Sequence, residues 1–302
     1  MAAEVSNNAL IKEAKAFHLK KRLGQHFLVD LQALQAIVTA LDATVDDTIV
    51  EVGPGIGFLT RFLAQTGARV VAIELDRESV ERLRAAKYSN VEVKHGDFLQ
   101  FDLNIKATAE GTMNVVGNVP YQITGLIIGH LLGELDKPSP WLHRIRNIVL
   151  TVQYEVAQRI VAHPGESEYS RLSILAQQYC ETHLIQRVPA DSFFPPPQVN
   201  SAIVRLIPRS APAVSCSNMV LMRQLVQAGF RQRRKMFRNA LGFLRLPQTT
   251  IDATFARLGM DPQVRAERLS LKQFAMLADA FNEMKLDAKA DSSSPREDQS
   301  DL

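Results

Sequence analysis

Short apolar runs alternate with amphipathic stretches over the first 208 residues of the chain. The runs with the length and composition of buried strands cover residues 48–53, 69–76, 91–97, 113–118, 147–153 and 201–207. The stretches with helical spacing cover residues 58–65, 77–87, 122–135, 154–162 and 171–180. Strands separated by helices at this rhythm predict βαβ units and a parallel sheet.

The pattern changes at Pro208 and Pro212, which stand among small residues typical of a linker. Beyond them it becomes wholly helical, with helices expected at 218–230, 231–244, 249–258 and 270–284. The last stretch, 285–302, is polar and predicts a disordered tail. The sequence therefore predicts an α/β domain over 1–208, a helical domain over 209–284 and the tail. Residues 1–19 of the first domain are expected to form a flexible arm.

Composition argues against several classes of protein. With 46% hydrophobic and 22% charged residues, the chain is not expected to be intrinsically disordered. No apolar run reaches the roughly 18–20 residues of a membrane span, and residues 1–10 have no apolar core of a secretory signal. Two cysteines, Cys180 and Cys216, do not suggest a disulfide scaffold or a structural zinc site. We expect no bound metal, no membrane partner and a cytoplasmic location.

The net charge of +3 conceals an uneven distribution. The 60 positions between Asp191 and Asp252 contain no acidic residue and nine basic ones. Removing these nine from the 35 basic residues leaves 26 against 32 acidic ones, a net charge of −6 for the rest of the chain. A local basic field of this kind attracts a polyanion. The nine are Arg205, Arg209, Arg223, Arg231, Arg233, Arg234, Lys235, Arg238 and Arg245.

The middle of this basic stretch is the candidate RNA-binding surface. If residues 231–245 form a helix, arginines at 231, 234, 238 and 245 fall on one face. Phosphate contacts from such a face position RNA without reading its bases. The ordinary alternative is a solvated basic face with no ligand. The candidate RNA-binding residues are Arg231, Arg234, Lys235 and Arg238, together with Lys20, Lys21 and Arg22 near the N-terminus.

A glycine-rich turn, Gly53-Pro54-Gly55-Ile56-Gly57, follows the first predicted strand and precedes a helix. Glycines at this point allow the backbone to approach a ligand closely, so Gly53 and Gly55 are candidate cofactor contacts. The spacing is G-x-G-x-G, which differs from the G-x-G-x-x-G of dinucleotide binders, and no Lys-Ser/Thr pair follows as in a P-loop. The turn indicates a nucleotide-like cofactor without identifying it.

Two carboxylates follow the next two predicted strands. Glu74 ends the second strand and can accept hydrogen bonds from both ribose hydroxyls of an adenosine cofactor, as in NAD and S-adenosylmethionine enzymes. Asp97 follows the third strand and can accept a hydrogen bond from the adenine amine. Singly, an acid at a strand end is more often a helix cap or turn former. Together with the glycine turn, the two acids favour S-adenosylmethionine.

The tetrapeptide Asn118-Val119-Pro120-Tyr121 ends the fourth predicted strand. An exocyclic adenine amine is a poor nucleophile, and the Asn118 oxygen beside a backbone carbonyl can accept its hydrogens and redirect its lone pair. Pro120 restricts the residue before it to an extended conformation, and Tyr121 offers a ring on which a base can stack. A sulfonium donor already has a good leaving group, so positioning supplies most of the catalysis. Standing alone, the tetrapeptide would be an ordinary Asn-x-Pro turn.

In combination, these segments resemble the ribosomal RNA adenine dimethyltransferase family. The matching stretches are RLGQHFL at 22–28, EVGPGIGFLT at 51–60, AIELD at 72–76, GDF at 96–98, NVPY at 118–121, QYEVA at 153–157 and FFPPPQVNS at 193–201. Several are loose alone, but their ordered combination is specific. The resemblance implies a class I S-adenosylmethionine-dependent methyltransferase domain, Rossmann-like with a mainly parallel sheet, followed by a small all-helical C-terminal domain.

The resemblance also assigns roles to individual residues. It implies that His26 and Leu28 contact the methionine part of S-adenosylmethionine, with Gly53 at the glycine turn. Glu74 would hold the ribose, Asp97 the adenine, and Asn118 both the cofactor and the target amine. Tyr121 and Phe193 would sandwich an extruded adenine. The chain departs from the family at two positions, His26 and Val119, where Asn and Leu are common.

The function implied is dimethylation of N6 of two adjacent adenosines in a 3′-terminal hairpin of small-subunit (16S) rRNA, with a role in small-subunit biogenesis. The implied partner is small-subunit rRNA in a pre-30S particle, and the chain is expected to be monomeric. Three alternatives remain at this stage: an assembly factor whose methylation is dispensable, a nicotinamide-dependent dehydrogenase, and a large-subunit rRNA dimethyltransferase. The 193–201 run and the long basic helical domain favour the small-subunit enzyme.

Overall fold

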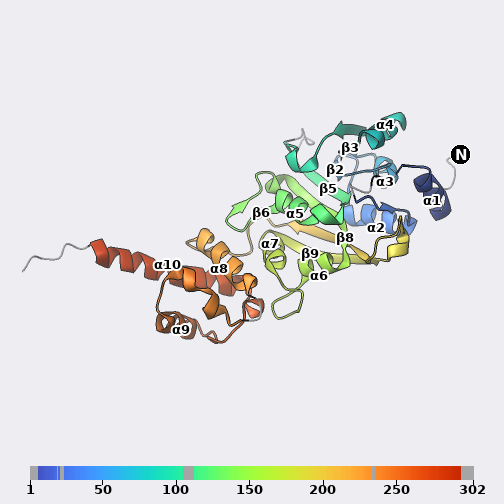
Figure 1. Cartoon of the computed structure of the whole chain (residues 1–302). Coiled ribbons are helices and arrows are strands. Elements are labelled where there is room, and N and C mark those ends of the chain that lie inside the picture. Colours follow the sequence, from blue (N-terminus) through green and yellow to red (C-terminus); the bar gives the residue numbers. More distant parts are fainter. Residues whose placement is uncertain (1–5, 19, 21–23, 105–111, 233–234, 294–302) are drawn as a thin grey trace, which may run out of the picture. The chain divides into compact units, whose positions relative to one another are not determined.

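A computed structural model describes residues 6–18, 20, 24–104, 112–232 and 235–293 (Figure 1). The chain divides into two compact units. The first is the chain up to Val161 together with Leu175–Ala211, and the second is Ala162–Ile174 with the chain from Pro212 onward. The sequence predicted one boundary, after residue 208. It did not predict that residues 162–174 belong to the second unit. Within the second unit, this segment packs its fully buried Tyr169 ring against Phe230, with centroids 5.8 Å apart.

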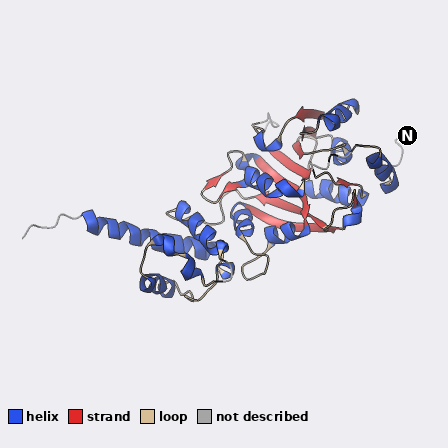
Figure 2. Ribbon diagram, in the orientation of Figure 1, coloured by secondary structure: helices blue, strands red, loops and turns tan. Residues whose placement is uncertain are grey.

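A seven-stranded sheet forms the centre of the first unit, with helices around it (Figure 2). Its strand order is β4-β3-β2-β5-β8-β11-β9, and the first five of these strands are parallel. β11 runs antiparallel to both β8 and β9. The strands are β2 (Thr48–Val52), β3 (Arg69–Glu74), β4 (Val91–His95), β5 (Met113–Asn118), β8 (Ile145–Gln153), β9 (Cys180–Val188) and β11 (Ser201–Pro208). The predicted mainly parallel sheet is therefore confirmed.

The remaining elements of the first unit are helices and two small sheets. The helices are α1 (Asn7–Lys15), α2 (Leu31–Leu41), α3 (Phe58–Gln65), α4 (Arg77–Ala85), α5 (Thr124–Leu132) and α6 (Tyr154–Val161), and α7 (Arg171–Tyr179) spans the boundary between the units. β1 (Phe27–Leu28) pairs with β10 (Phe193–Phe194), and β6 (Gly133–Glu134) pairs with β7 (Lys137–Pro138). The β1–β10 pair joins the segment before α2 to the proline-rich segment before β11.

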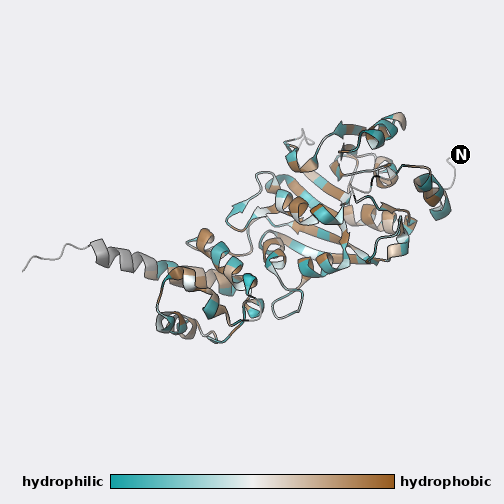
Figure 3. Ribbon diagram, in the orientation of Figure 1, coloured by the Kyte–Doolittle hydropathy of each residue, from teal (hydrophilic) through white to brown (hydrophobic). Residues whose placement is uncertain are grey.

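Burial follows from the position of each element. All five residues of β2 are buried, as expected for a central parallel strand covered on both faces. Figure 3 shows apolar residues along the central strands, whereas α4 is largely hydrophilic. α2 begins at Asp30, whose carboxylate accepts hydrogen bonds from the backbone N–H groups of Gln32 and Ala33 at 2.9 and 3.3 Å. This cap directs the apolar face of α2, including Leu34 and Ile37, into the core.

The second unit is helical, as predicted, but one of its helices is not where the sequence placed it. Its main helices are α8 (Met219–Arg231), α9 (Gln248–Arg257) and α10 (Leu271–Ser293), with short 3₁₀ turns η6 (Phe237–Ala240), η7 (Gly242–Leu244) and η8 (Ala266–Arg268). The prediction of a single helix over 231–244 is wrong. The backbone N–H of Phe237 donates to Val264 O at 2.8 Å and not to a carbonyl one helical turn earlier. The Phe237 ring is fully buried.

α10 also continues to Ser293, into the segment expected to be a disordered tail, because residues 285–293 are rich in helix formers such as Ala and Lys. Residues 294–302 lie outside the described part of the chain. Among the helices that are described, none is long and apolar enough to cross a membrane.

Candidate active site

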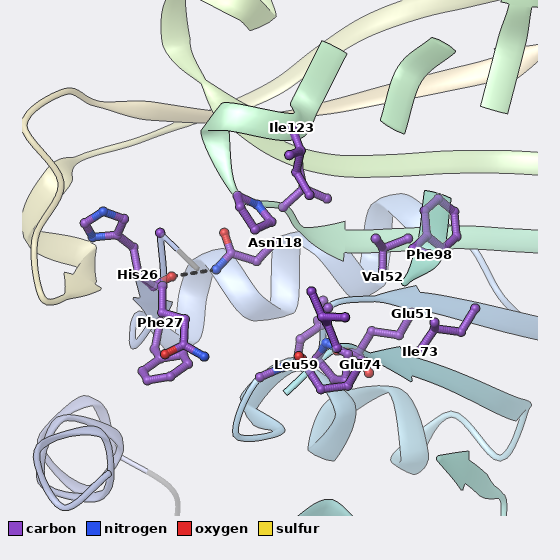
Figure 4. Close-up of a pocket in the computed structure, with 18 of the residues that line it drawn as sticks. His26, Phe27, Glu51, Val52, Leu59, Ile73, Glu74, Phe98, Asn118 and Ile123 are labelled. Atoms are coloured by element: carbon purple, nitrogen blue, oxygen red, sulfur yellow. Dashed lines mark hydrogen bonds between the residues drawn. The ribbon is translucent and has the colours of Figure 1, made fainter. Parts of the chain in front are cut away.

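A cavity of about 320 Å³ opens at the carboxyl ends of four neighbouring strands, β4, β3, β2 and β5. Its walls are residues 51–56, 73–75, 96–98 and 118–123, which follow or end these strands, and residues 24–28, which enter β1. Ligands of parallel α/β proteins bind at this edge of the sheet. The glycine turn, both predicted acids and the Asn118 tetrapeptide therefore meet at one site (Figure 4).

The glycine turn lies against the wall of this cavity in the left-handed backbone geometry that favours glycine. Gly53 and Gly55 have φ of +62° and +57°. A Cβ on Gly55 would lie 2.9 Å from Cε1 of Phe27, so no larger residue fits there. Among the described residues, no atom lies within 4 Å of the corresponding position at Gly53. The turn is thus closed on the Phe27 side and open toward the cavity at Gly53.

Glu74 is held rigidly at the end of β3. Its side chain accepts hydrogen bonds from the backbone N–H of Gly55 at 2.8 Å and from that of Asp76 at 2.8 Å, one on each carboxylate oxygen. Burial raises the pKa of Glu74 above its ordinary value, and the two backbone donors oppose this rise. Both oxygens retain a further lone pair that can accept a hydroxyl hydrogen. The arrangement fits a predicted contact with two vicinal ribose hydroxyls.

Asp97 has the capping role that the sequence left open, and its contact with a cofactor stays a prediction. Its carboxylate accepts a hydrogen bond from the backbone N–H of Leu99 at 3.0 Å and so caps the short helix η2 (Phe98–Gln100). It also lines the cavity, beside the apolar side chains of Ile73, Leu75 and Phe98. An acceptor at the edge of an apolar slot is the environment that an adenine ring with its amine requires.

Asn118 faces the cavity from the end of β5 with its orientation fixed. Its side-chain Nδ2 donates a hydrogen bond to the backbone carbonyl of His26 at 2.8 Å (Figure 4). Because the amide nitrogen is committed to His26, the amide oxygen Oδ1 is the group left to accept hydrogens from a ligand amine. The backbone that follows is also constrained, since Pro120 has φ −59° and ψ 131° and starts the 3₁₀ turn η3 (Tyr121–Ile123).

Tyr121 borders the same cavity and is held at its hydroxyl. That hydroxyl forms a hydrogen bond with Ser201 Oγ at 2.5 Å, at the start of β11. Burial raises the pKa of Tyr121, so the phenol stays neutral at physiological pH. The ring is available for stacking only where its faces are not already covered by protein.

Three residues to which the family resemblance gave roles differ from one another in where they lie relative to the cavity. Leu28 lines the cavity from β1 and is 3% exposed. The His26 side chain points away from the cavity, toward the proline-rich segment, although its backbone carbonyl binds Asn118 (Figure 4). Phe193 pairs with Leu28 in the β1–β10 sheet, is 3% exposed and is not among the described residues that line the cavity. A stacking role for Phe193 stays a prediction.

Glu51 is a residue of the cavity wall to which the sequence analysis gave no role. It is 1% exposed and accepts a hydrogen bond from Thr60 Oγ1 at 2.7 Å. Burial raises the pKa of Glu51 to about 8, and the nearby Glu74 contributes to the rise. The signal was present as a single carboxyl inside an otherwise apolar strand, residues 48–52. Burial therefore favours the neutral form of the Glu51 carboxyl.

The raised pKa of Glu51 makes the stability of the protein depend on pH. Between the ordinary value of 4.5 and about 8, the folded chain holds a proton that the unfolded chain has lost, so the free energy of unfolding falls as pH rises through this window. Glu51→Gln keeps the acceptor for Thr60 and removes the titration. We expect the wild type to lose on the order of 3 kcal/mol relative to this variant between pH 5 and 8.

Urea unfolding of both proteins at pH 5, 6.5 and 8 measures this difference. The pKa of Glu74 is also raised, but Glu74 is present in both proteins and cancels in the comparison. Glu81→Gln, an exposed position on α4, is the control and is expected to follow the wild type. Parallel pH profiles for wild type and Glu51→Gln would show that Glu51 is ionised in the folded state.

Lys20 is the one candidate RNA-binding cation near the N-terminus that lies within the described residues. Lys20 forms an ion pair with Asp76 and lies 3.4 Å from a carboxylate oxygen of Glu78. Lys20 is therefore committed to acids at the start of α4. Lys21 and Arg22 lie outside the described residues.

The described basic residues of the second unit do not share one helix face. Arg231 is exposed at the end of α8, and Lys235 is exposed four residues later. Arg238 pairs with Asp252 at 2.8 Å, so its charge is partly neutralised. Arg234 lies outside the described residues. The expected single face is wrong because α8 ends at Arg231 and Arg245 adopts a left-handed conformation with φ 57°.

A second, open cavity of about 550 Å³ lies in the second unit. Its lining combines two cations, Lys235 and Arg265, with the amides of Gln232, Asn239 and Gln263. Cations surrounded by amide groups suit phosphate and nucleotide contacts. In the described ranges, no group of three or more His, Cys, Asp or Glu side chains could hold a metal ion.

Comparison with known proteins gives one family over nearly the whole chain. The model of the family described as "Ribosomal RNA adenine dimethylase" matches residues 16–283. A "Ribosomal RNA small subunit methyltransferase A" from Hahella chejuensis is 38% identical over 262 residues, which are 86% of this chain and 92% of that protein. A protein of the same name from Clostridium perfringens is 37% identical over 268 residues, which are 88% and 92% of the two chains.

Solved structures agree in fold. A dimethyladenosine transferase from Plasmodium falciparum is similar with a TM-score of 0.72 and 26% identity, covering 86% of this chain and 98% of that one. The 23S rRNA methyltransferase ErmE is similar in fold with a TM-score of 0.64 and 24% identity, covering 85% of this chain and 99% of that one. The predicted class I methyltransferase fold is thereby confirmed.

Proposed function

The chain belongs to the ribosomal RNA adenine dimethylase family, and from this premise we propose that it dimethylates small-subunit rRNA with S-adenosylmethionine as methyl donor. The target is N6 of two adjacent adenosines in the 3′-terminal hairpin of 16S rRNA, within a pre-30S particle in the cytoplasm. Relatives named for the small subunit are 34–38% identical over most of the chain. The similarity to ErmE, at 24% identity, concerns the fold alone. A monomeric state stays a prediction.

The observation that carries the proposal is the convergence of four strand ends on one cavity. The glycine turn, Glu74, Asp97 and Asn118 line it together. The fixed carboxylate of Glu74, the apolar slot beside Asp97 and the open backbone at Gly53 fit the ribose, adenine and methionine parts of the donor. The donor carries its methyl group on a sulfonium. After transfer the rest of the donor leaves as a neutral thioether, so the leaving group needs no acid catalyst.

The protein's own contribution to transfer is orientation of the target amine. Asn118 Oδ1, fixed by the Nδ2 bond to His26 O, accepts one amine hydrogen and turns the nitrogen lone pair toward the donor. The rim formed by Pro120 and Tyr121 presents a polar backbone and an aromatic ring to the same base. A paired adenine cannot reach this point, so the target nucleotide must be unstacked from its helix.

The proposed substrate is tested by incubating the protein with labelled S-adenosylmethionine and unmodified small subunits, in parallel with large-subunit rRNA. Mass spectrometry of the products should show N6,N6-dimethyladenosine at two adjacent positions of the small-subunit rRNA only. Label found in large-subunit rRNA alone, or in neither, would overturn the proposal.

RNA binding by the second unit is supported by its open basic cavity. Lys235→Gln removes one exposed cation from the cavity lining. We expect it to weaken binding to small subunits by about threefold to tenfold and to flatten the salt dependence of affinity by up to about 0.9 in logarithmic slope. Filter binding at several salt concentrations measures both. Arg257→Gln, an equal charge change on the exposed side of α9, is the control and should bind as the wild type does.

A further inference from the structure

His26 is one of the residues that line the cavity, but the polar contact of its side chain is with the proline-rich segment. Its Nδ1 lies 2.7 Å from the backbone oxygen of Pro195, and Figure 4 shows the imidazole directed away from Glu74. Because a carbonyl oxygen can only accept, Nδ1 carries the hydrogen of this bond. The imidazole thus binds residues between β10 and β11 and is not directed at a donor in the cavity.

The same imidazole also lies along the ring of Tyr121. The two ring centroids are 5.9 Å apart and the planes differ by 18°, which is a stacked arrangement within the range of favourable aromatic pairs. At its other end, Tyr121 is held by the hydroxyl bond to Ser201. The ring of His26 therefore lies against one face of Tyr121, so we expect a stacking base to use the opposite face.

The backbone of His26 adds a third contact, since its carbonyl accepts the hydrogen bond from Asn118 Nδ2 at 2.8 Å. One residue thus contacts the amide of Asn118, the ring of Tyr121 and the carbonyl of Pro195. These are the groups that orient the target amine, stack on its base and continue into the segment that carries Ser201. Groups that meet a substrate must be held to within a fraction of an ångström, which requires supporting residues of this kind.

We propose that His26 is a positioning residue for the target adenine and not a contact of the methyl donor. The inference rests on the proposed function. Its ring supports Tyr121 from behind and its Nδ1–H holds the proline-rich segment at a fixed distance from that ring. This differs from the role that family resemblance assigns to position 26. The difference lies in the imidazole ring, which stacks on Tyr121 and which an asparagine lacks.

Three substitutions separate the two side-chain contacts. His26→Asn keeps a donor of similar reach without a ring, His26→Phe keeps a ring without the donor, and His26→Ala removes both. Calorimetry gives the Kd for S-adenosylmethionine, and methyl transfer gives kcat and KM for the small subunit. We expect His26→Ala to bind the donor within about twofold of the wild type, with kcat about tenfold lower and a raised KM for the subunit. The Asn and Phe variants should each recover part of this loss.

The outcome that overturns the inference is a donor Kd raised tenfold or more by His26→Ala with kcat unchanged, because that is the signature of a donor contact. Wild-type transfer by all three variants overturns it as well. Recovery by either the Asn or the Phe variant supports it and identifies the contact that matters more. His183→Ala, an exposed histidine on β9, is the matched control and should leave all three constants unchanged.

A fluorescence measurement on the bound RNA tests the position of the target base without any methyl transfer. The probe is a small-subunit hairpin with 2-aminopurine at the target position. We expect Tyr121 to quench the fluorescence of the 2-aminopurine in the wild type, and the fluorescence to remain brighter with His26→Ala. Thermal unfolding checks that each variant is folded, and His26→Asn serves if His26→Ala is not. A wild-type protein that transfers no methyl group overturns the proposed function and this inference together. An active wild type with unaffected variants overturns the inference alone.

Discussion

Asn118→Ala is expected to lower methyl transfer by about three orders of magnitude or more while leaving binding to small subunits intact. The substitution removes the only side-chain oxygen that the proposed mechanism directs at the target amine, and it releases the hydrogen bond to His26 O. Loss of one fixed acceptor that acts in the transition state costs about 10²–10³ in rate, and misorientation of the amine adds to this. Single-turnover methyl transfer and filter binding on the same preparation measure the two quantities separately.

The control for Asn118→Ala is Asn104→Ala, which removes an exposed amide that binds Arg144 in the same unit. That variant should methylate as the wild type does. Calorimetry with the donor shows whether Asn118→Ala also affects donor binding. If Asn118→Ala methylates small subunits at the wild-type rate, the role assigned to Asn118 is wrong. If it is inactive and also fails to bind subunits, the asparagine acts on structure and not on transfer.

Glu74→Gln is expected to weaken the binding of S-adenosylmethionine by about tenfold to a hundredfold. The carboxylate is held by the backbone N–H groups of Gly55 and Asp76, so its remaining lone pairs have a fixed direction toward the cavity. A hydrogen bond to a charged group contributes about 1.5–3 kcal/mol, and two ribose hydroxyls would lose at least one of these. In the glutamine variant an NH₂ group also takes the place of one carboxylate oxygen, so a donor replaces an acceptor. This donor then faces either a backbone N–H or a ribose hydroxyl.

The sulfur end of the ligand supplies an internal control for this prediction. S-adenosylhomocysteine has the same ribose but no positive charge, so calorimetry should show an equal loss of affinity for both ligands. A loss confined to the cationic donor would instead mean that Glu74 acts through charge on the sulfonium. Glu81→Gln, exposed on α4, should bind both ligands as the wild type does. Donor affinity within threefold of the wild type for Glu74→Gln would contradict the ribose assignment.

The sequence predicted the chemistry at the strand ends because each apolar run stops where a functional residue begins. β2, β3 and β5 end beside Gly53, at Glu74 and at Asn118, close to their predicted limits. Parallel strands bring these ends to one edge of the sheet whatever the lengths of the connecting helices. The fold class and the positions of the candidate site residues could therefore be predicted together from local patterns.

What the sequence could not predict depends on contacts between distant positions. The direction of the His26 side chain is set by Pro195, 169 positions away. β9 was missed because it is an edge strand whose residues are mostly exposed, so it lacks an apolar run. The helix expected over 231–244 is broken because Phe237 bonds to Val264 and not within a helix. In each case the decisive partner comes from another part of the chain.

The pairing of β1 with β10 has a consequence for the time at which the donor site is completed during biosynthesis. Residues 27–28 leave the ribosome early, but their partners Phe193 and Phe194 are made near the end of the first unit. At a synthesis rate of about 5–20 residues per second, the delay is on the order of 10–30 s. Until then, the nascent chain has the glycine turn and both acids but lacks the strand that fixes the Phe27 wall. We therefore expect the cavity wall at Phe27 to reach its final form only after the proline-rich segment has emerged.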